Sequence, residues 1–553
     1  MTDTARPGPM LAADGTPLKT SLNRALRRQK LRALLLISPL LLFVLITFIA
    51  PIADMLFRSV ENDIVANTLP RTVVALHKWD ADTGDLPDDA TYEALYEDLF
   101  IAQEYKTHTR LGSRLNYENV GMSSLFRKAG REVQDMGELY QDQFEGLDKA
   151  WGKAATWASL MASPDYLASV DEWQADKKAE GSGFSRLPPK FEANPDIADL
   201  LPQTTEAYGQ YAKFMRTDKD KPATTSEPWS LVYTKFYEDL AANPAGLSAY
   251  SGPEAELLKT AAAAVPGFKT ETRKQQFIDG DKDWADHEVW ATIKLYSSRY
   301  TPGYFLNAVD LRLTPEGIQS QPETQRIYLM LFRRTLFMSM AITISCILLG
   351  YPVAWILANL PARQANLLMI LVLLPFWTSL LVRTSAWKVL LQQQGVINDV
   401  LVWLGVVDDA HRLVMINNQF GTIVAMTHIL LPFMILPLYS VMKTIPPSYL
   451  RAAKSLGATN FTAFWRVYFP QSVPGIGAGS ILVFILAIGY YITPEIVGGT
   501  TGTFISNRIA YHISSSLNWG LAAALGAILL GAVLILYWAY DRIVGIDNVK
   551  LGG

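Results

Sequence analysis

Residues 451–470, with the sequence RAAKSLGATNFTAFWRVYFP, lie between two long apolar runs and decide how the rest of the chain is interpreted. The stretch is too polar to span a bilayer, yet its apolar residues recur at helical spacing. Gly457 stands where a first short helix would end. Thr459 or Asn460 can cap a second helix, which we expect Pro470 to terminate. The stretch therefore predicts two short helices joined by a turn.

The predicted second helix carries an aromatic face. Its aromatic residues follow at i, i+3, i+4 and i+7 and are Phe461, Phe464, Trp465 and Tyr468. A lipid surface would cover such a face, since helices with Trp and Phe lie at bilayer interfaces. The same stretch contains small residues that let another backbone approach closely, namely Ala452, Ala453, Gly457 and Ala458. Because docking on lipid does not require small residues, we favour a protein partner.

The composition indicates a membrane protein. Of the 553 residues 50% are hydrophobic, and the mean hydropathy is +0.13. Crossing the hydrocarbon layer takes about 20 residues, and six apolar runs approach or exceed this length: 34–57, 335–357, 367–387, 420–442, 475–496 and 521–540. The apolar part of the first run exceeds the roughly 7 to 15 residues of a secretory signal. We therefore predict that it is a retained anchor.

Basic residues indicate the orientation of the spans. If six spans alternate, most cations of the short loops and the termini lie on one side: Arg24, Arg27, Arg28, Lys30, Arg32, Arg363, Lys443, Arg451, Lys454, Arg466, Arg542 and Lys550. That side is the cytoplasm by the positive-inside rule. We expect a multi-pass membrane protein with both termini in the cytoplasm and residues 58–326 on the opposite side of the membrane.

The chain divides into four parts by composition. They are a basic N-terminus (1–33), the first span (34–57), an insert (58–326) and a part that holds the other five apolar runs (327–553) and includes a cytoplasmic loop (443–472). The insert carries 43 acidic against 29 basic residues. This balance fits either a soluble exported domain or a surface that attracts a cationic solute or a basic partner. Periodic apolar residues predict a mostly helical insert, as in Tyr92, Leu95, Tyr96, Leu99 and Phe100.

Several kinds of site are excluded by the sequence. No Walker A pattern, paired metal-ligand spacing or serine or cysteine triad is apparent, so we predict no catalytic residue. The segment from Asp279 resembles the start of a calcium loop, but Trp284 replaces the required glycine and Trp290 the required glutamate. We predict no metal site, no cofactor in this chain and no nucleic-acid partner. No convincing tandem repeat is apparent either.

The loop resembles the cytoplasmic EAA loop of binding-protein-dependent ABC transporter permeases. The pattern of that family is Glu-Ala-Ala, three residues, Gly, nine residues and then Ile-x-Leu-Pro. Its spacing is kept here by Ala452, Ala453, Gly457 and Pro470. Arg451 stands in place of the Glu, and Val467 and Phe469 stand where Ile and Leu are usual.

Three membrane segments are most similar to the spermidine/putrescine subgroup of that family. They are LLGYPVAWILA (348–358), LPFWTSLLVRTSAW (374–387) and LLPFMILPLYSVM (430–442). Members of the subgroup usually have a much shorter segment between the first two spans. The role of the insert at 58–326 therefore does not follow from the resemblance.

The resemblance implies an all-α, six-helix permease of a type I ABC importer in a bacterial inner membrane. Residues 58–326 would then be a periplasmic insert and residues 327–553 the permease core. It implies two partner ATPase subunits that bind ATP and Mg²⁺, a second and different permease subunit, and a periplasmic solute-binding protein. The residues that it places against an ATPase are Arg451, Ala452, Ala453, Gly457, Ala458, Phe461, Phe464, Trp465 and Pro470. The chain itself would then be a transport subunit and not an enzyme.

A second group of candidate residues lies near the predicted outer ends of the spans. They are Trp377, Arg383, Tyr490, Tyr491 and Glu495. Glu495 is the only acid within or bordering spans two to five, and its charge would attract an ammonium group beside cation–π faces. Alternatively, Glu495 forms a structural ion pair with Arg383 or is simply solvated. His428 is more typical of a helix–helix hydrogen bond than of a ligand.

Three functions remain open at this point. The first is an ATP-driven importer of a polyamine-like cation, or of an opine, ferric iron or another organic ion. The second is an ion-driven transporter, which normally has polar groups deep in the spans. The third is a membrane receptor whose insert recognises the ligand.

Overall fold

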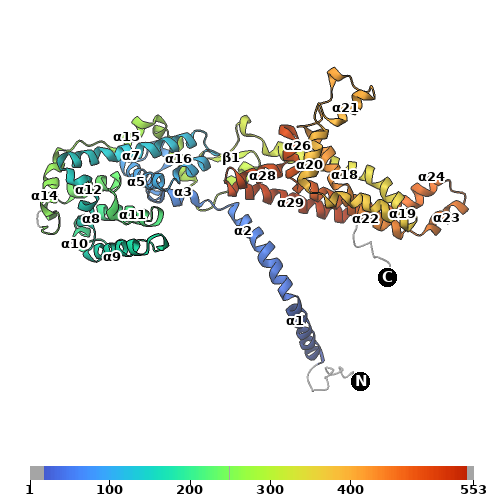
Figure 1. Cartoon of the computed structure of the whole chain (residues 1–553), viewed down its shortest axis with the longest axis horizontal. Coiled ribbons are helices and arrows are strands. Elements are labelled where there is room, and N and C mark those ends of the chain that lie inside the picture. The colour runs from blue at the N-terminus through green and yellow to red at the C-terminus, as the bar shows by residue number, and fades with distance from the viewer. Residues whose placement is uncertain (1–17, 248–249, 545–553) are drawn as a thin grey trace, which may run out of the picture. The chain divides into compact units, whose positions relative to one another are not determined.

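The computed structural model describes residues 18–247 and 250–544 (Figure 1). The protein is all-α as predicted, and in the described residues the only sheet is the hairpin of β1 (Leu311–Thr314) and β2 (Gly317–Ser320). The cytoplasmic placement of residues 1–17 and of Lys550 concerns positions outside the described residues.

The chain folds into two compact units. The insert unit consists of Asn62–Thr301 and Leu313–Ile318. The membrane unit contains the residues up to Glu61, Pro302–Arg312 and the residues from Gln319 onward. Residues 302–312 and 319–326, which the sequence analysis placed in the insert, therefore pack with the spans.

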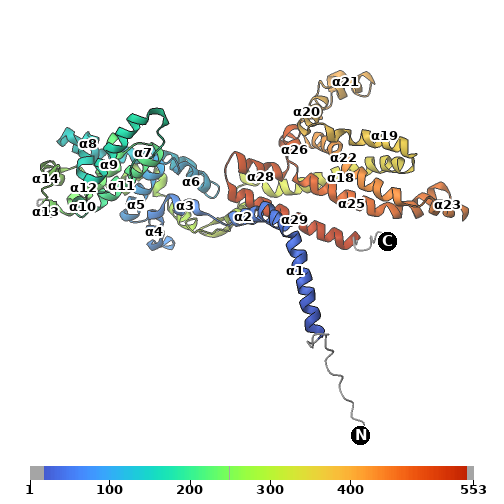
Figure 2. The ribbon, with the colours of Figure 1, turned by 60° about the horizontal axis from the view of Figure 1, so that its bottom comes forward.

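The insert unit is built from short and medium helices, whose arrangement can also be followed in Figure 2. Their bounds are α3 (Asp63–Thr68), α4 (Pro70–Lys78), α5 (Asp89–Glu104), α6 (His108–Leu115), α7 (Met122–Leu147), α8 (Ala154–Met161), α9 (Pro164–Glu180), α10 (Pro195–Ala198), α11 (Pro202–Asp218), α12 (Ser230–Ala242), α13 (Pro244–Leu247), α14 (Ala255–Ala264), α15 (Arg273–Gly280) and α16 (His287–Leu295). The apolar face predicted on α5 is buried, with Tyr92 and Leu99 fully so.

Aromatic side chains form the core of the insert unit. Trp151, Trp157, Trp284 and Trp290 have no exposed surface. Large aromatic rings bury more apolar area than any other side chain, and pairs of them add stability through edge-to-face contacts. The single cysteine, Cys346, lies in the membrane unit, so the apolar core rather than a disulfide stabilises the insert unit.

The membrane unit contains the long apolar helices. Its helix bounds are α1 (Leu18–Val44), α2 (Ala50–Arg58), α17 (Gly303–Ala308), α18 (Tyr328–Asn359), α19 (Ala362–Leu373), α20 (Leu380–Leu390), α21 (Val396–Trp403), α22 (Gln419–Thr444), α23 (Pro447–Ser455), α24 (Asn460–Ala463), α25 (Phe469–Gly489), α26 (Ile492–Val497), α27 (Gly499–Gly502), α28 (Ile505–Ser514) and α29 (Trp519–Val544). In the described residues five helical segments are long and apolar enough to cross a membrane, and a bent pair raises this to six.

The third predicted span is not the straight helix expected over 367–387. The segments Ala362–Trp377 and Leu380–Leu390 meet at an angle of 94°. Pro375 lacks an amide N–H, and Thr378 and Ser379 adopt extended dihedral angles. The apolar run correctly predicted a membrane segment here, but it did not indicate that the segment is broken.

Glycines let the central spans approach one another closely. A Cβ at Gly479 would lie 2.6 Å from Met434 Sδ, and one at Gly475 would lie 3.0 Å from Val441 Cβ. Both contacts join α25 to α22. Small residues at helix interfaces are the usual basis of packing in membranes, where the hydrophobic effect does not drive helices together.

Asp310 caps the start of the second span. Its carboxylate accepts hydrogen bonds from the backbone N–H groups of Ile327, Tyr328 and Leu329, at 2.9 to 3.0 Å. The first amides of a helix have no partner within the helix, and an anion there also interacts favourably with the helix dipole. This cap fixes the residue at which α18 begins.

A buried charge network joins α5 and α12 in the insert unit. The ammonium group of Lys235, only 5% exposed, lies 3.0 Å from Glu93, 2.5 Å from Glu97 and 2.9 Å from Glu238. The guanidinium of Arg273 contacts Glu93 at 3.1 Å. Removing one member of such a network leaves its partners buried and unpaired, which costs more than the intact network contributes.

This network predicts a pH-dependent stability. Burial raises the pKa of the Glu238 carboxyl to about 7, although Lys235 opposes the shift. A carboxyl with a raised pKa binds its proton more tightly in the folded state, so its contribution to stability falls as the pH rises through this range. We predict that the stability of Glu238→Gln relative to the wild type rises by about 2 kcal/mol as the pH is raised from about 5 to about 8.

The measurement is thermal unfolding of the full chain in detergent, followed by tryptophan fluorescence across this pH range. Comparing the variant with the wild type at each pH cancels the contributions of all other titrating groups. Parallel pH profiles for the two proteins would contradict the assignment to Glu238.

Candidate functional site

The loop over residues 443–472 has the predicted helix–turn–helix form. Helix α23 ends at Ser455, and Gly457 follows with φ of +88°, the left-handed conformation that favours glycine. The turn is closed by a hydrogen bond from the Gly457 N–H to the Lys454 carbonyl at 3.0 Å. Thr459 then caps α24, because its hydroxyl accepts a hydrogen bond from the Thr462 N–H at 3.2 Å.

The prediction that Pro470 ends the second helix is wrong. Helix α24 continues through a π turn, Phe464–Tyr468, into α25, so that Asn460–Gly489 forms one span. Within the π turn the Phe469 N–H donates to the Phe464 carbonyl. Pro470 then falls in the first turn of α25, where a missing N–H costs little. The loop helix and the fifth span are therefore one continuous helix.

The predicted aromatic face is divided by the π turn. Phe461 is 74% exposed and Trp465 47% exposed, whereas Tyr468 is buried at 3%. The Phe464 ring stacks on Tyr468 with centroids 5.9 Å apart. One half of the aromatic residues thus faces outward, and the other half fixes the base of the loop.

The base of the loop is attached to the second span through Tyr351. The Tyr351 ring packs on Phe464 and Phe469, with centroids 6.2 and 5.9 Å apart. Its hydroxyl is 2.9 Å from Ser472 Oγ. A displacement of the loop helix is therefore transmitted to α18 as well as to α25.

The outward surface of the loop is apolar for its position. Tyr449 is 51% exposed and Leu456 is 89% exposed, in addition to Phe461 and Trp465, whose ring centroids lie 6.2 Å apart. Arg451 is also exposed, and within residues 18–247 and 250–544 it makes no ion pair. We call the surface formed by Tyr449, Leu456, Phe461 and Trp465 the loop patch.

The five candidate pathway residues lie at two breaks in the spans. Trp377 is 71% exposed at the bend before α20, which carries Arg383. Tyr490 and Tyr491 occupy the break between α25 and α26, and Glu495 is exposed on α26. The hydroxyls of Thr384 and Thr493 are 3.1 Å apart and connect α20 to α26.

Glu495 is bound by an amide and not by a guanidinium. Asn507 Nδ2 donates to Glu495 Oε2 at 2.6 Å and to the Tyr491 carbonyl at 2.9 Å. In the part of the chain that the structure describes, no ion pair joins Glu495 to Arg383. The separate expectation that His428 forms a helix–helix hydrogen bond is confirmed, because the Trp387 indole N–H donates to its Nδ1 at 3.1 Å.

Sequence reasoning missed Tyr351 and Asn507. Both act through partners that are distant in the sequence, since Tyr351 meets Ser472 and Asn507 meets Glu495. A polar residue inside or beside an apolar run is the only local signal for either. That signal does not name the partner.

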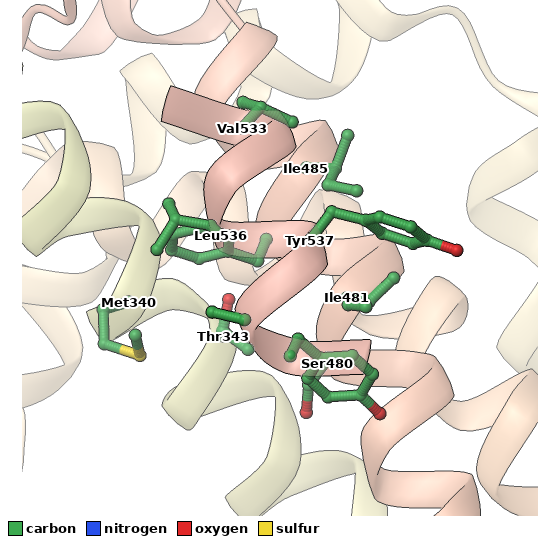
Figure 3. A pocket seen from close by; sticks show the side chains of 11 residues that line it. Met340, Thr343, Ser480, Ile481, Ile485, Val533, Leu536 and Tyr537 are labelled. Atoms are coloured by element: carbon green, nitrogen blue, oxygen red, sulfur yellow. The ribbon is translucent and has the colours of Figure 1, made fainter. Parts of the chain in front are cut away.

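An apolar pocket of about 290 Å³ opens among the spans. Figure 3 shows its side chains coming from three helices: Met340 and Thr343 of α18, Ser480, Ile481 and Ile485 of α25, and Val533, Leu536 and Tyr537 of α29. Its few polar atoms and its place among membrane helices suit a lipid chain or an apolar side chain. It contains none of the candidate pathway residues.

In the described residues five helices, or six with the bent pair, are long and apolar enough to span a membrane, and the loop over residues 443–472 joins two of them. Residues 334–544 match the family model described as "Binding-protein-dependent transport system inner membrane component". The chain belongs to this family, which makes it an ABC importer permease and a multi-pass protein of the inner membrane, and a transport subunit rather than an enzyme.

The chain is also similar to individual permease proteins. The spermidine/putrescine transport system permease protein PotB of Salmonella typhimurium is 36% identical over 39% of this chain and 76% of its own length. The inner membrane ABC transporter permease protein YdcU of Escherichia coli is 32% identical over 45% of this chain and 82% of its own. A crystal structure of a bacterial alginate ABC transporter aligns with 41% of this chain at 18% identity, with a TM-score of 0.33, too low to support an argument.

The left-handed turn at Gly457 generates a testable prediction. A β-branched residue in this conformation costs about 1 to 2 kcal/mol, so Gly457→Val should loosen the end of α23. We expect amide hydrogen exchange in Pro447–Ser455 to become faster by about tenfold. The control is Ser455→Ala, an exposed helical position that needs no unusual dihedral angle.

Hydrogen exchange of the full chain in detergent, read by mass spectrometry, distinguishes the two variants. Unchanged exchange in α23 of Gly457→Val would contradict the conformation assigned to the turn.

Proposed function

We propose that the loop over residues 443–472 is the surface on which an ATPase subunit docks and through which ATP binding and hydrolysis drive transport. The observation that carries this proposal is the loop patch. Leu456, 89% exposed, and Phe461, 74% exposed, lie on a loop that the basic residues assign to the cytoplasm. Large exposed apolar patches mark interaction sites.

The mechanism follows from the continuity of the helix behind the patch. Because Asn460–Gly489 is one span, a force on Phe461 acts directly on the fifth span. Tyr351 links the same base to the second span. Closure of ATPase subunits around ATP and Mg²⁺ would therefore shift two spans together and expose the pathway alternately to the two sides.

The partners follow from the family and from the single loop. An importer of this kind needs two permease subunits, two ATPase subunits and a periplasmic solute-binding protein, and this chain provides one permease with one loop. We propose that the second permease is a different chain. The proposed orientation places both termini in the cytoplasm and the insert unit in the periplasm.

The proposed substrate is a polyamine-like cation. PotB is named as a spermidine/putrescine permease and is 36% identical to this chain over its membrane part. Glu495 offers a negative charge, and the exposed rings of Trp377 and Tyr491 offer cation–π faces to an ammonium group. Asn507 holds the carboxylate in place by a 2.6 Å hydrogen bond.

The docking proposal is tested by changing the loop patch. Leu456→Asp and Phe461→Asp each place a charge at the centre of the proposed interface, where such changes typically cost about 2 kcal/mol or more. We expect more than a tenfold loss of the ATPase subunits that copurify with the chain, with a parallel loss of ATP-driven uptake.

Val120→Asp is the matched control, because Val120 is 62% exposed but lies in the insert unit. It should leave copurification unchanged. If both loop variants retained their ATPase and their uptake, the loop patch would not be the docking surface.

The substrate proposal is tested at Glu495. Glu495→Gln keeps an oxygen for the Asn507 hydrogen bond but removes the charge, so we expect uptake of radiolabelled spermidine by cells to need about fivefold more substrate, as for a loss of about 1 kcal/mol. Asp408→Asn, an exposed acid in the neighbouring outer loop, is the control. Unchanged uptake in Glu495→Gln would remove Glu495 from the pathway, and no spermidine uptake by the wild type would overturn the substrate class.

A further inference from the structure

Two segments of the insert unit share a tryptophan motif at identical spacing. Asp148-Lys149-Ala150-Trp151 is followed by Trp157-Ala158, and Asp281-Lys282-Asp283-Trp284 is followed by Trp290-Ala291. Each Asp side chain caps a short 3-10 turn, by accepting from the Ala150 N–H at 2.8 Å and from the Asp283 N–H at 3.1 Å. In each segment the second indole donates to the carbonyl of the first tryptophan, at 2.7 Å and 3.0 Å.

The same pairing extends to two further segments. The run TYEALYEDL in α5 corresponds to VYTKFYEDL in α12, so that Tyr92 and Asp98 correspond to Tyr233 and Asp239. The run LPRT before and within α4 corresponds to LPQT at the start of α11. All matched segments occur in the same order along the chain.

The matched segments make the same tertiary hydrogen bonds. The carboxylate of Asp98 accepts from the N–H and the hydroxyl of Thr72, both at 2.8 Å. The carboxylate of Asp239 accepts from the N–H and the hydroxyl of Thr204, at 2.8 and 2.7 Å. Leu69 and Leu201, which precede the two prolines, are fully buried and have nearly the same dihedral angles.

Contacts between the two sets of segments are reciprocal. The Tyr92 hydroxyl donates to the Trp284 carbonyl at 2.7 Å, and the Tyr233 hydroxyl donates to the Trp151 carbonyl at 2.6 Å. The tyrosine of each set thus contacts the tryptophan of the other. Reciprocal contacts of this kind are the signature of a two-fold interface.

The start of each set is also hydrogen-bonded to the end of the other set. The Asn194 N–H, at the start of the second set, donates to the Met161 carbonyl at the end of the first, at 2.9 Å. Asn62, at the start of the first set, donates through its side chain to the Tyr296 carbonyl at the end of the second, at 2.6 Å.

We infer that the insert unit consists of two copies of one helical unit, covering residues 62–161 and 194–295, that pack about an approximate two-fold axis and exchange their halves. The first half of each copy, with its Leu-Pro-x-Thr and tyrosine segments, packs on the tryptophan segment of the other copy. The expectation that the chain contains no repeat is wrong. It failed because the copies differ at most positions and in the lengths between the matched segments.

The copies have diverged most clearly in charge where they face one another. The Tyr140 ring packs on Tyr237 with centroids 4.6 Å apart, and in the corresponding place the Arg273 guanidinium lies 3.9 Å above the Tyr96 ring. Lys235 and Arg273 come from the second copy, and their shared partner Glu93 comes from the first.

These ion pairs have a consequence for assembly. The corresponding positions of Glu93, Lys235 and Arg273 in the other copy are Thr234, Ala94 and Tyr140, so two first copies or two second copies would lack the complementary charges. Charges placed in this way specify which surfaces pair. The network therefore favours pairing of the two copies within one chain over exchange of copies between chains.

An exchange of corresponding segments tests the repeat in the full chain. Residues 148–160 are replaced by the sequence of residues 281–293, because Trp151, Trp157 and Leu160 and their counterparts Trp284, Trp290 and Ile293 all have no exposed surface. The control replaces 148–160 by residues 255–267, a segment of the same length in which the helix precedes the 3-10 turn instead of following it.

We expect amide hydrogen exchange in α12, whose Tyr233 contacts this segment, to stay within about threefold of the wild type in the first variant and to rise by more than tenfold in the control. Equal loss of protection in both variants would overturn the inference.

A second pair of variants is independent of any clash in the exchanged segment. Thr72→Val and Thr204→Val each remove one hydrogen bond to the corresponding aspartate, and we expect each to speed exchange in the helix that carries that aspartate, by about fivefold. A clear effect of one variant with no effect of the other would contradict the equivalence of the two copies.

Discussion

The structure of the membrane unit depends on how its backbone accommodates Pro470. A proline inside an α-helix removes one hydrogen bond and clashes with the preceding turn, and in the membrane an unpaired backbone group is especially costly. The π turn at Phe464–Tyr468 solves both problems, since the Phe469 N–H bonds to the Phe464 carbonyl and Pro470 falls in a first turn. As a result the second helix of the loop and the fifth span form one continuous helix.

This helix is packed against other helices of the membrane unit. Gly475 and Gly479 bring it against α22, and Tyr351 ties its base to α18 through Ser472. At its outer end the chain breaks at Tyr490 and Tyr491, where Asn507 and the Thr384–Thr493 contact hold the short α26. The loop patch and the outer breaks are thus the two ends of one element. Under the proposed docking of an ATPase, movement of the loop patch would reach the breaks at Tyr490 and Tyr491 through this one helix.

Local patterns in the sequence were sufficient for the class of fold and for the loop. Apolar length gave the spans, periodicity gave the buried face of α5, and Gly457 and Thr459 gave the turn and the cap. Features that depend on distant partners were not accessible. The bend of 94° after Trp377 and the helix through Pro470 depend on local backbone conformations, a break after Pro375 and a π turn before Pro470, that residue type alone does not specify. For Glu495 the sequence left open an ion pair with Arg383 or simple solvation, and nothing in its local pattern indicates Asn507, which donates to the carboxylate at 2.6 Å. The duplicated insert was missed because few residues of each copy, chiefly those that hydrogen-bond or fill the core, have stayed the same.

The central claim, that the loop patch is the surface gripped by an ATPase subunit, is tested most directly by cross-linking. Cys346 is the only cysteine and is buried, so Leu456→Cys provides a single reactive position for a benzophenone probe in membranes that contain the whole transporter. The account predicts that illumination joins this chain to an ATP-binding subunit, with a yield that changes when ATP is added. Cross-links to lipid alone, in membranes where the complex is active, would contradict it.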